Sequence, residues 1–348
     1  LIMAFWSLAC ASHGLAGGIV ALAASRLLLG VGEGGGFPAA TRAVTEWFPA
    51  KDRATAMGII NGGTAVGAVI APPLIALILT QAGWFGLAPW RWVFFLTGGM
   101  GLLWVFWWMS AYRTPAVAAA DAGAADATED KITLGQILAH TEVKAVIFAK
   151  FLSDGAWYFY LFWLPKYLFD AFHLDIKTAG SIGWIPYAAS GLGALVGGSL
   201  SSHLLGRGAS VNRARKIALG LSAALMPWVM LAPHTQSVAV VIFLFSLAFF
   251  GQQSWSTLIM VLPTDLIPRR AVGTLAGLVG FGGAMGGVTL GQIVGWMRDH
   301  GYSYEPALIL TGSMHIAAFI VICLLIPNIK ALTFLPISRT TTTTRTAV

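Results

Sequence analysis

Charged residues are scarce in this sequence. Only 10% of its 348 residues are Asp, Glu, Lys or Arg, whereas 57% are hydrophobic, and the mean hydropathy is +0.76. A soluble domain has about a quarter of its residues charged. The charges that are present gather in short segments between long apolar runs. This pattern excludes an ordinary soluble domain and predicts a membrane protein with many spans.

Cysteine is nearly absent as well. Cys10 and Cys323 lie in apolar segments near opposite ends of the chain, and their spacing favours neither a disulfide nor a metal site. The histidines are scattered without the spacing of metal ligands. No nucleophile–base pair is evident within the spans. We therefore expect no metal, no cofactor, no catalytic residues and no enzymatic activity.

The sequence also lacks the marks of nucleotide or nucleic-acid binding. It contains no Walker motif, which argues against an ATP-driven pump. The segment GVGEGGG has the spacing G-x-G-x-x-G, but it lies inside an apolar run and follows no strand, so we reject a nucleotide site there. The net charge of +7 comes from basic residues in short loops, which is typical of topology signals rather than of nucleic-acid binding.

Ten apolar stretches are long enough to cross a bilayer, which takes about 20 residues per helix. The chain opens at Leu1 directly in such a stretch, with no pattern of a cleavable signal. We predict an all-α integral membrane protein with spans at 1–16, 19–48, 56–82, 91–112, 146–170, 178–205, 215–233, 237–263, 270–297 and 305–327.

The longest hydrophilic stretch, 113–141, separates four spans from six. We therefore divide the chain into a first bundle (1–112), a linker (113–145), a six-helix bundle (146–327) and a low-complexity tail that we expect to be disordered (328–348).

The basic residues predict the orientation in the membrane. Most of the 21 lie in alternate loops on one side, whereas the other side has only Arg91, Lys166, Lys177 and Arg298. Cytoplasmic loops carry the excess of Lys and Arg. We therefore place the linker and both ends of the chain in the cytoplasm.

Two opposite charges, Arg26 and Glu33, lie inside the second span. Their separation is close to two helical turns, so both side chains project from one face. A charge inside a membrane helix normally faces the protein interior or a water-filled cavity. We expect Arg26 to hold a substrate carboxylate and Glu33 to carry a proton. The alternative is a structural ion pair that ties two helices together.

A second pair of charges, Lys150 and Asp154, starts the fifth span at a spacing of i, i+4. They can pair with each other, or Lys150 can extend its ammonium group to water at the interface. Asp154 shares a helix face with Trp157 and Tyr158, whose rings suit the apolar face of a sugar. We expect these two aromatic residues to bind substrate, and Asp154 to be a second candidate for proton coupling.

Two polar groups interrupt other spans. Gln252, Trp255 and Ser256 share one face at i, i+3 and i+4, and Asn61 and Thr64 form a similar pair. Uncharged polar residues inside a bilayer need partners. We expect all five to contact substrate, with contacts between helices as the alternative.

Several of these segments resemble a known family. RLLLGVGEGGGFPAATRAVTEWFPAKDRATAMGIINGGTAVGAVIAPP and the later WRWVFFLTGGMGLLW resemble the fourth to sixth helices of major facilitator superfamily transporters. FLSDGAWYFYLFWLPKYL, GSLSSHLLGRGASVNRARK and GQQSWSTL are similar to the anion:cation symporter branch, in particular to bacterial hexuronate (galacturonate or glucuronate) transporters. The similarity covers about residues 1–327.

The resemblance implies a fold of two six-helix halves, of which this chain holds helices 3–12, ten of the usual twelve. The first two helices and the signature loop after the second would then be missing. We therefore expect that the 348-residue chain does not transport alone, and a version with two such helices restored would test this. A degenerate form of the signature remains in the second half, with Ser202 and His203 where Asp and Arg stand in the family.

The resemblance also implies a function. The matching Arg and Glu of the family take part in binding and proton coupling, which supports those roles for Arg26 and Glu33. We expect a monomeric secondary transporter of the bacterial inner membrane that couples a sugar-acid anion, hexuronate first, to protons by alternating access. Its partners would be the small carboxylate, protons and the lipid bilayer. The alternatives are symport of another carboxylate (aldonate, glucarate, tartrate or an aromatic acid) or a non-transporting membrane receptor.

Overall fold

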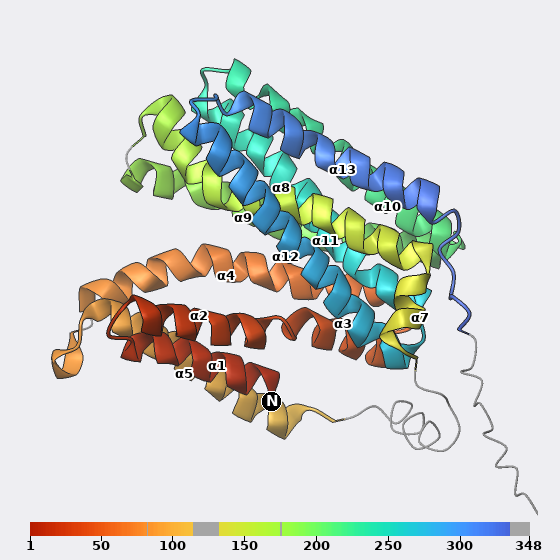
Figure 1. Cartoon of the computed structure of the whole chain (residues 1–348), viewed down its shortest axis with the longest axis horizontal. Helices are drawn as coiled ribbons and strands as arrows, with labels where there is room; N and C mark the ends of the chain where they lie inside the picture. Colours follow the sequence, from red (N-terminus) through yellow and green to blue (C-terminus); the bar gives the residue numbers. More distant parts are fainter. Residues whose placement is uncertain (82, 114–131, 175, 335–348) are drawn as a thin grey trace, which may run out of the picture.

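The protein is built from helices, with no strand in the part of the chain that the structure describes (Figure 1). That part comprises residues 1–81, 83–113, 132–174 and 176–334 of a computed structural model. Seven helical segments in it are long and apolar enough to cross a membrane. The all-helical membrane fold predicted from composition is confirmed.

The first half of the molecule contains the helices of four predicted spans. The first is α1 and the short 3-10 helix η1, the second is α2 followed by α3, and the third and fourth are α4 and α5, with η2 between them. Their bounds are Ile2–Ser12 (α1), His13–Leu15 (η1), Ile19–Glu33 (α2), Gly36–Trp47 (α3), Arg53–Gln81 (α4), Trp84–Gly86 (η2) and Pro89–Ala111 (α5).

The second half contains the helices of six predicted spans and begins with the short helix α7, whose Thr133 and Gln136 form a capping box. Helices lie at all ten positions where the sequence predicts spans, and seven of them are the segments long and apolar enough to cross a membrane; among the described residues, α1 with η1, α8 and α9 do not meet that criterion. Their bounds are Leu134–Ala139 (α7), Thr141–Phe172 (α8), Ile176–Gly206 (α9), Val211–Ala224 (α10), Pro227–His234 (η3), Val238–Leu266 (α11), Arg269–Asp299 (α12) and Glu305–Leu325 (α13). Most of the predicted linker and the end of the predicted tail (114–131 and 335–348) lie outside the described residues.

The second predicted span, 19–48, is confirmed as Ile19–Trp47, with a local irregularity at Gly34 and Gly35 that separates α2 from α3. It breaks after Glu33, the last residue of α2, and resumes at Gly36. Successive glycines disfavour a helix, and Pro38 has no N–H with which to bond the carbonyl of Gly34. The break leaves the carboxylate of Glu33 at a helix end in the middle of the span.

The seventh predicted span also departs from a regular helix. After α10 ends at Ala224, the chain continues as the 3-10 helix η3 from Pro227. A proline at this position cannot donate to the carbonyl four residues earlier and clashes with it. The span therefore crosses as two consecutive segments.

Small residues let the helices pack closely. On α12, a Cβ at Gly286 would collide with the backbone carbonyl of Phe151 on α8. On α4, a Cβ at Gly58 would lie 2.6 Å from the carbonyl oxygen of Ala194 on α9. The α8–α12 contact lies within the second half, whereas the α4–α9 contact joins the two halves. Figure 1 shows α3 crossing next to α12 as a further contact between the halves.

Candidate functional site

The two charges predicted in the second span lie on α2, and both side chains are exposed. Arg26 and Glu33 are within electrostatic range of each other. Within the described ranges, no hydrogen bond or ion pair holds either of them to a second helix, which is what a structural tether would require. In this part of the chain, the structure therefore contains no tether between helices at Arg26 or Glu33.

The predicted aromatic residues lie on α8, opposite this pair. Tyr158 is half-buried, packs against Gly287 of α12 and is within electrostatic range of Glu33. Trp157 is also half-buried and meets Phe249 of α11 edge-on, with ring centroids 5.2 Å apart. The fold thus brings a phenol of the second half toward the carboxylate of the first half.

The second charged pair forms the centre of a buried network. Lys150 Nζ lies 2.9 Å from Asp154 Oδ1 and donates to Ser256 Oγ on α11, also at 2.9 Å. The side chains of Lys150 and Asp154 are only 7% and 15% exposed. Lys150 therefore does not reach water at the interface, which was one of the two interpretations of the sequence. The other, that it pairs with Asp154, is what the structure contains.

The network extends to a histidine that the sequence did not single out. Gln252 on α11 donates from Nε2 to Asp154 Oδ1 at 3.5 Å, and its Oε1 is hydrogen-bonded to His315 Nε2 on α13. His315 is fully buried, and its ring meets Trp255 edge-on. No sequence signal marks His315, because an isolated histidine in an apolar helix has no motif around it.

The polar residues predicted on α11 and α4 occupy different environments. Gln252 and Trp255 are fully buried in this conformation, whereas Ser256 is half-buried. Asn61 is also buried and donates from Nδ2 to Thr257 Oγ1 of α11 at 3.0 Å, so it bridges the two halves. Thr64 is exposed and its hydroxyl donates to the carbonyl of Asn61 within the same helix.

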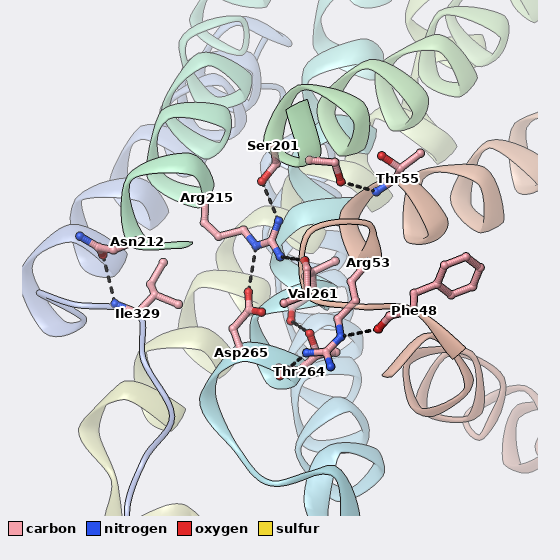
Figure 2. Close-up of polar contacts among 12 residues, drawn as sticks. Phe48, Arg53, Thr55, Ser201, Asn212, Arg215, Val261, Thr264, Asp265 and Ile329 are labelled. Atoms are coloured by element: carbon pink, nitrogen blue, oxygen red, sulfur yellow. Dashed lines mark hydrogen bonds and ion pairs between the residues drawn. The ribbon is translucent and has the colours of Figure 1, made fainter. Parts of the chain in front are cut away.

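The two halves are held together at one end by a set of hydrogen bonds that we call the clamp (Figure 2). Arg215 of α10 is fully buried, lies 2.8 Å from Asp265 Oδ2 and donates to Ser201 Oγ at 2.7 Å. It also reaches the carbonyl of Ala50 in the first half at 3.3 Å. Ser201 and Arg215 both belong to the segment GSLSSHLLGRGASVNRARK, which the sequence identified as a degenerate signature.

Two further bonds complete the clamp. Arg53 of α4 donates from Nη1 to the carbonyl oxygen of Thr264 at 3.0 Å, and the amide N–H of Thr55 donates to Ser202 Oγ at 3.2 Å. Both cross from the first half to the second. Apolar residues of α3 and α4, among them Met57, pack against α11 and α12 in the same region. The clamp end is therefore closed to solvent.

Toward the other end, the halves enclose a crevice of about 920 Å³. Its walls are α4 of the first half and α8 and α9 of the second, and mainly apolar residues line it: Pro72, Pro73, Leu164, Phe169, Trp184 and Tyr187 among them. The molecule is thus closed at the clamp and hollowed on the opposite side of the interface.

A polar cluster ties α8 to α12 and α13 beside the crevice. Asp170 accepts a hydrogen bond from the Tyr304 hydroxyl at 2.7 Å and pairs with Lys166 at 3.0 Å and with Arg298 at 3.6 Å. The Arg298 guanidinium also covers the Tyr304 ring at 4.2 Å. Burial and the hydrogen bond to Asp170 raise the pKa of the Tyr304 hydroxyl above its ordinary value, so it remains a donor at neutral pH.

Residues 1–291 match the protein-family model described as Major Facilitator Superfamily. The chain belongs to the Major Facilitator Superfamily. It is therefore a multi-pass membrane transporter and not an enzyme, and the resemblance stated from its motifs is confirmed.

Two named relatives and one solved structure are similar to most of this chain. The chain is 28% identical to a protein named D-galactonate transporter of Escherichia coli O6:H1, over 93% of the chain and 78% of that protein. It is also 28% identical to the hexuronate transporter of Escherichia coli K12, over 84% of the chain and 70% of the relative. Among solved structures, FucP in the outward conformation has the same fold, with a TM-score of 0.71 over 93% of this chain and 80% of FucP at 14% identity.

Proposed function

We propose that this transporter carries out proton-coupled symport of a sugar-acid anion, with hexuronate as the first candidate. The observation that carries the proposal is the presence of a cation and a carboxylate inside the membrane region of each half. Arg26 and Glu33 lie on α2, and Lys150 and Asp154 lie on α8. Ionisable residues within membrane helices mark substrate and proton paths.

The chemistry of an anion explains why a cation and an acid are needed together. The guanidinium of Arg26 is exposed and can bind a carboxylate with two parallel hydrogen bonds. A proton taken up by Glu33 would neutralise the charge that the anion brings. Lys150 and Asp154 would act in the second half in the same way, with the anion competing with Asp154 for the ammonium group.

The rest of the site suits a polyhydroxylated substrate. Trp157 and Tyr158 are half-buried rings against which the apolar face of a sugar can pack. Ser256 and Thr64 carry hydroxyls on partly or fully exposed surface. Asn61, Gln252 and Trp255 are buried here, and a role in binding would require the halves to move apart.

Alternating access supplies that movement. In this conformation the clamp closes one end of the interface and the crevice lies on the other side of it. Rocking of one half against the other would break the bonds of Arg53 and Arg215 that cross between the halves and would expose the site to the clamp side.

The names of the relatives support a sugar-acid substrate and leave several sugar acids open. They include D-galactonate, hexuronate and galactarate or D-glucarate transporters. An aldonate or an aldarate is therefore the next candidate, before tartrate or an aromatic acid. We further propose that the protein is a monomer in a bacterial inner membrane, with the clamp end and both ends of the chain in the cytoplasm.

Uptake into proteoliposomes tests the proposal. Accumulation of D-galacturonate should follow an imposed pH gradient and should be inhibited by D-glucuronate or D-galactonate in a competition panel. Each assay is run on the 348-residue chain and on a version that carries two further helices at its start. Accumulation that ignores the pH gradient would refute symport, and saturable binding without any exchange of labelled anion would favour a receptor.

A further inference from the structure

A buried histidine on α13 is connected to the charged pair on α8 through one glutamine. His315 is 0% exposed, and its Nε2 is hydrogen-bonded to Oε1 of Gln252 on α11. The other end of the same amide donates to Asp154, which holds Lys150. None of the residues to which the proposed function assigns a role lies on α13. The chain of bonds therefore links a helix outside the proposed path to a pair inside it.

The hydrogen bonds that link Asp154, Gln252 and His315 have a fixed direction. Asp154 offers only acceptors when it is ionised, so the Gln252 amide must turn its NH₂ toward the carboxylate. Its oxygen then faces His315, and His315 must carry a hydrogen on Nε2 to donate to it. The reverse orientation of the amide would place two oxygens against each other at Asp154. His315 thus satisfies the buried amide oxygen only in the orientation that Asp154 requires.

The carboxylate is enclosed by three helices. Asp154 Oδ1 faces Lys150 Nζ and Gln252 Nε2. On the other side, Gly283 of α12 provides the space for Oδ2, because a Cβ there would collide with that oxygen. The charged and titratable groups around it are Lys150 and Tyr158 of α8 and His315 behind the amide, whereas α11 and α12 present uncharged residues. Among the residues that the structure describes, Gln252 alone donates a hydrogen bond to Asp154 from another helix.

We propose that His315 is a positioning residue that holds Asp154 on Lys150 by fixing the Gln252 amide. This inference rests on the proposed function, in which the anion must displace Asp154 from Lys150 before a proton binds to Asp154. Without a donor at position 315, the buried amide oxygen is left unsatisfied and the amide is free to turn. Asp154 then loses its second donor, and proton binding no longer waits for the anion.

The test compares two measurements on each variant: accumulation of D-galacturonate under a pH gradient, and exchange of labelled for unlabelled D-galacturonate without a gradient. A residue that only supports folding lowers both in proportion to the amount of folded protein. A residue that positions the coupling group lowers accumulation and leaves exchange nearly intact. The quantity to compare between variants is therefore the ratio of accumulation to exchange.

A second buried histidine serves as the matched control. His13 is 3% exposed, stacks on Phe94 at 4.9 Å and, within the described part of the chain, is hydrogen-bonded only to backbone carbonyls of the preceding helix α1. Substituting leucine at His13 removes a similar imidazole without touching the network. His315→Gln is the conservative variant, because its amide NH₂ can still donate to Gln252.

We expect the ratio of accumulation to exchange to fall by about ten-fold or more in His315→Leu, because the freed Gln252 amide gives up its hydrogen bond to the charged Asp154, and losing a bond to a charged group has at least that effect. His315→Gln should stay within about three-fold of the unmodified chain, since one neutral donor replaces another. The ratio should not change in His13→Leu. Because His315 acts through Gln252, adding His315→Leu to Gln252→Leu should lower the ratio no further.

Two results would overturn the inference while leaving symport in place: an equal loss of accumulation and exchange in His315→Leu, or a further loss in the double variant. Failure of the unmodified chain, with and without the two added helices, to accumulate any sugar acid under a pH gradient would instead refute the proposed function.

Discussion

Replacing Arg53 by methionine is expected to open the clamp without unfolding the protein. Arg53 Nη1 donates to the carbonyl of Thr264 across the interface, and its guanidinium is within electrostatic range of Asp265. Methionine keeps much of the apolar stem and loses every donor. By contrast, the bond between Arg215 and Asp265 lies within the second half, so breaking it mainly affects the folding of that half.

The size of the effect follows from the one charged hydrogen bond that crosses the interface from Arg53. Such bonds contribute about 1.5–3 kcal/mol. Arg53 is half-buried, so solvent screening places its bond near the lower end of this range. A loss of about 1.4 kcal/mol corresponds to a ten-fold rise in the population that is open at the clamp.

Thiol labelling measures this population. Met57 is 0% exposed and lies in the apolar cluster between the halves, so a cysteine at this position reacts only when the clamp opens. The two native cysteines, Cys10 and Cys323, are first replaced by alanine. When closing is fast relative to labelling, the rate follows the open fraction.

The labelling rate of Met57→Cys should rise about ten-fold when Arg53→Met is added, while the thermal unfolding temperature changes little. The control is Lys51→Met, which removes an exposed positive charge two residues away. An unchanged rate in Arg53→Met, or an equal rise in Lys51→Met, would refute the assignment of Arg53 to the clamp.

Two further predictions concern the charged pairs. Glu33→Gln should abolish gradient-driven accumulation of D-galacturonate while binding and exchange persist, because the amide keeps the shape but takes up no proton; unchanged accumulation would show that Glu33 is not the coupling acid. Asp154→Asn should destabilise the protein by about 3 kcal/mol, because it leaves Lys150 as a buried charge without its carboxylate. The control is Lys166→Met, which breaks the i, i+4 pair with Asp170 on the same helix. The lysine of this pair is 54% exposed, so the substitution should lower the free energy of unfolding by less than about 1 kcal/mol. Equal losses of stability for the two variants in thermal unfolding in detergent would contradict this account.

The pair on α8 shows where reasoning from spacing succeeds and where it stops. The i, i+4 separation of Lys150 and Asp154 predicts that they can meet, and they do. The same spacing is compatible with a lysine that reaches water. Which outcome occurs depends on the packing of α11 and α12 around the pair, and no local pattern contains that information.

The clamp and His315 illustrate the same limit. Arg215 is, in the sequence, one of several basic residues in a loop, yet it is fully buried and bonded to Asp265 and Ser201. His315 is an isolated polar residue in an apolar helix, yet it binds Gln252 of another helix. Their partners lie on other helices, between 14 and 63 residues away in the chain, so these contacts arise only when those helices pack together.

Local patterns in the sequence are enough to predict the class of protein, the positions of its helices and the four ionisable residues inside them. These features depend on hydropathy over about 20 residues and on local helix periodicity, and both act within one segment. The packing of distant helices is what buries Lys150, lets Asn61 bridge the halves and brings His315 into the network. Inside a bilayer each polar group must find a partner within the protein, and that partner is set by which helices pack together.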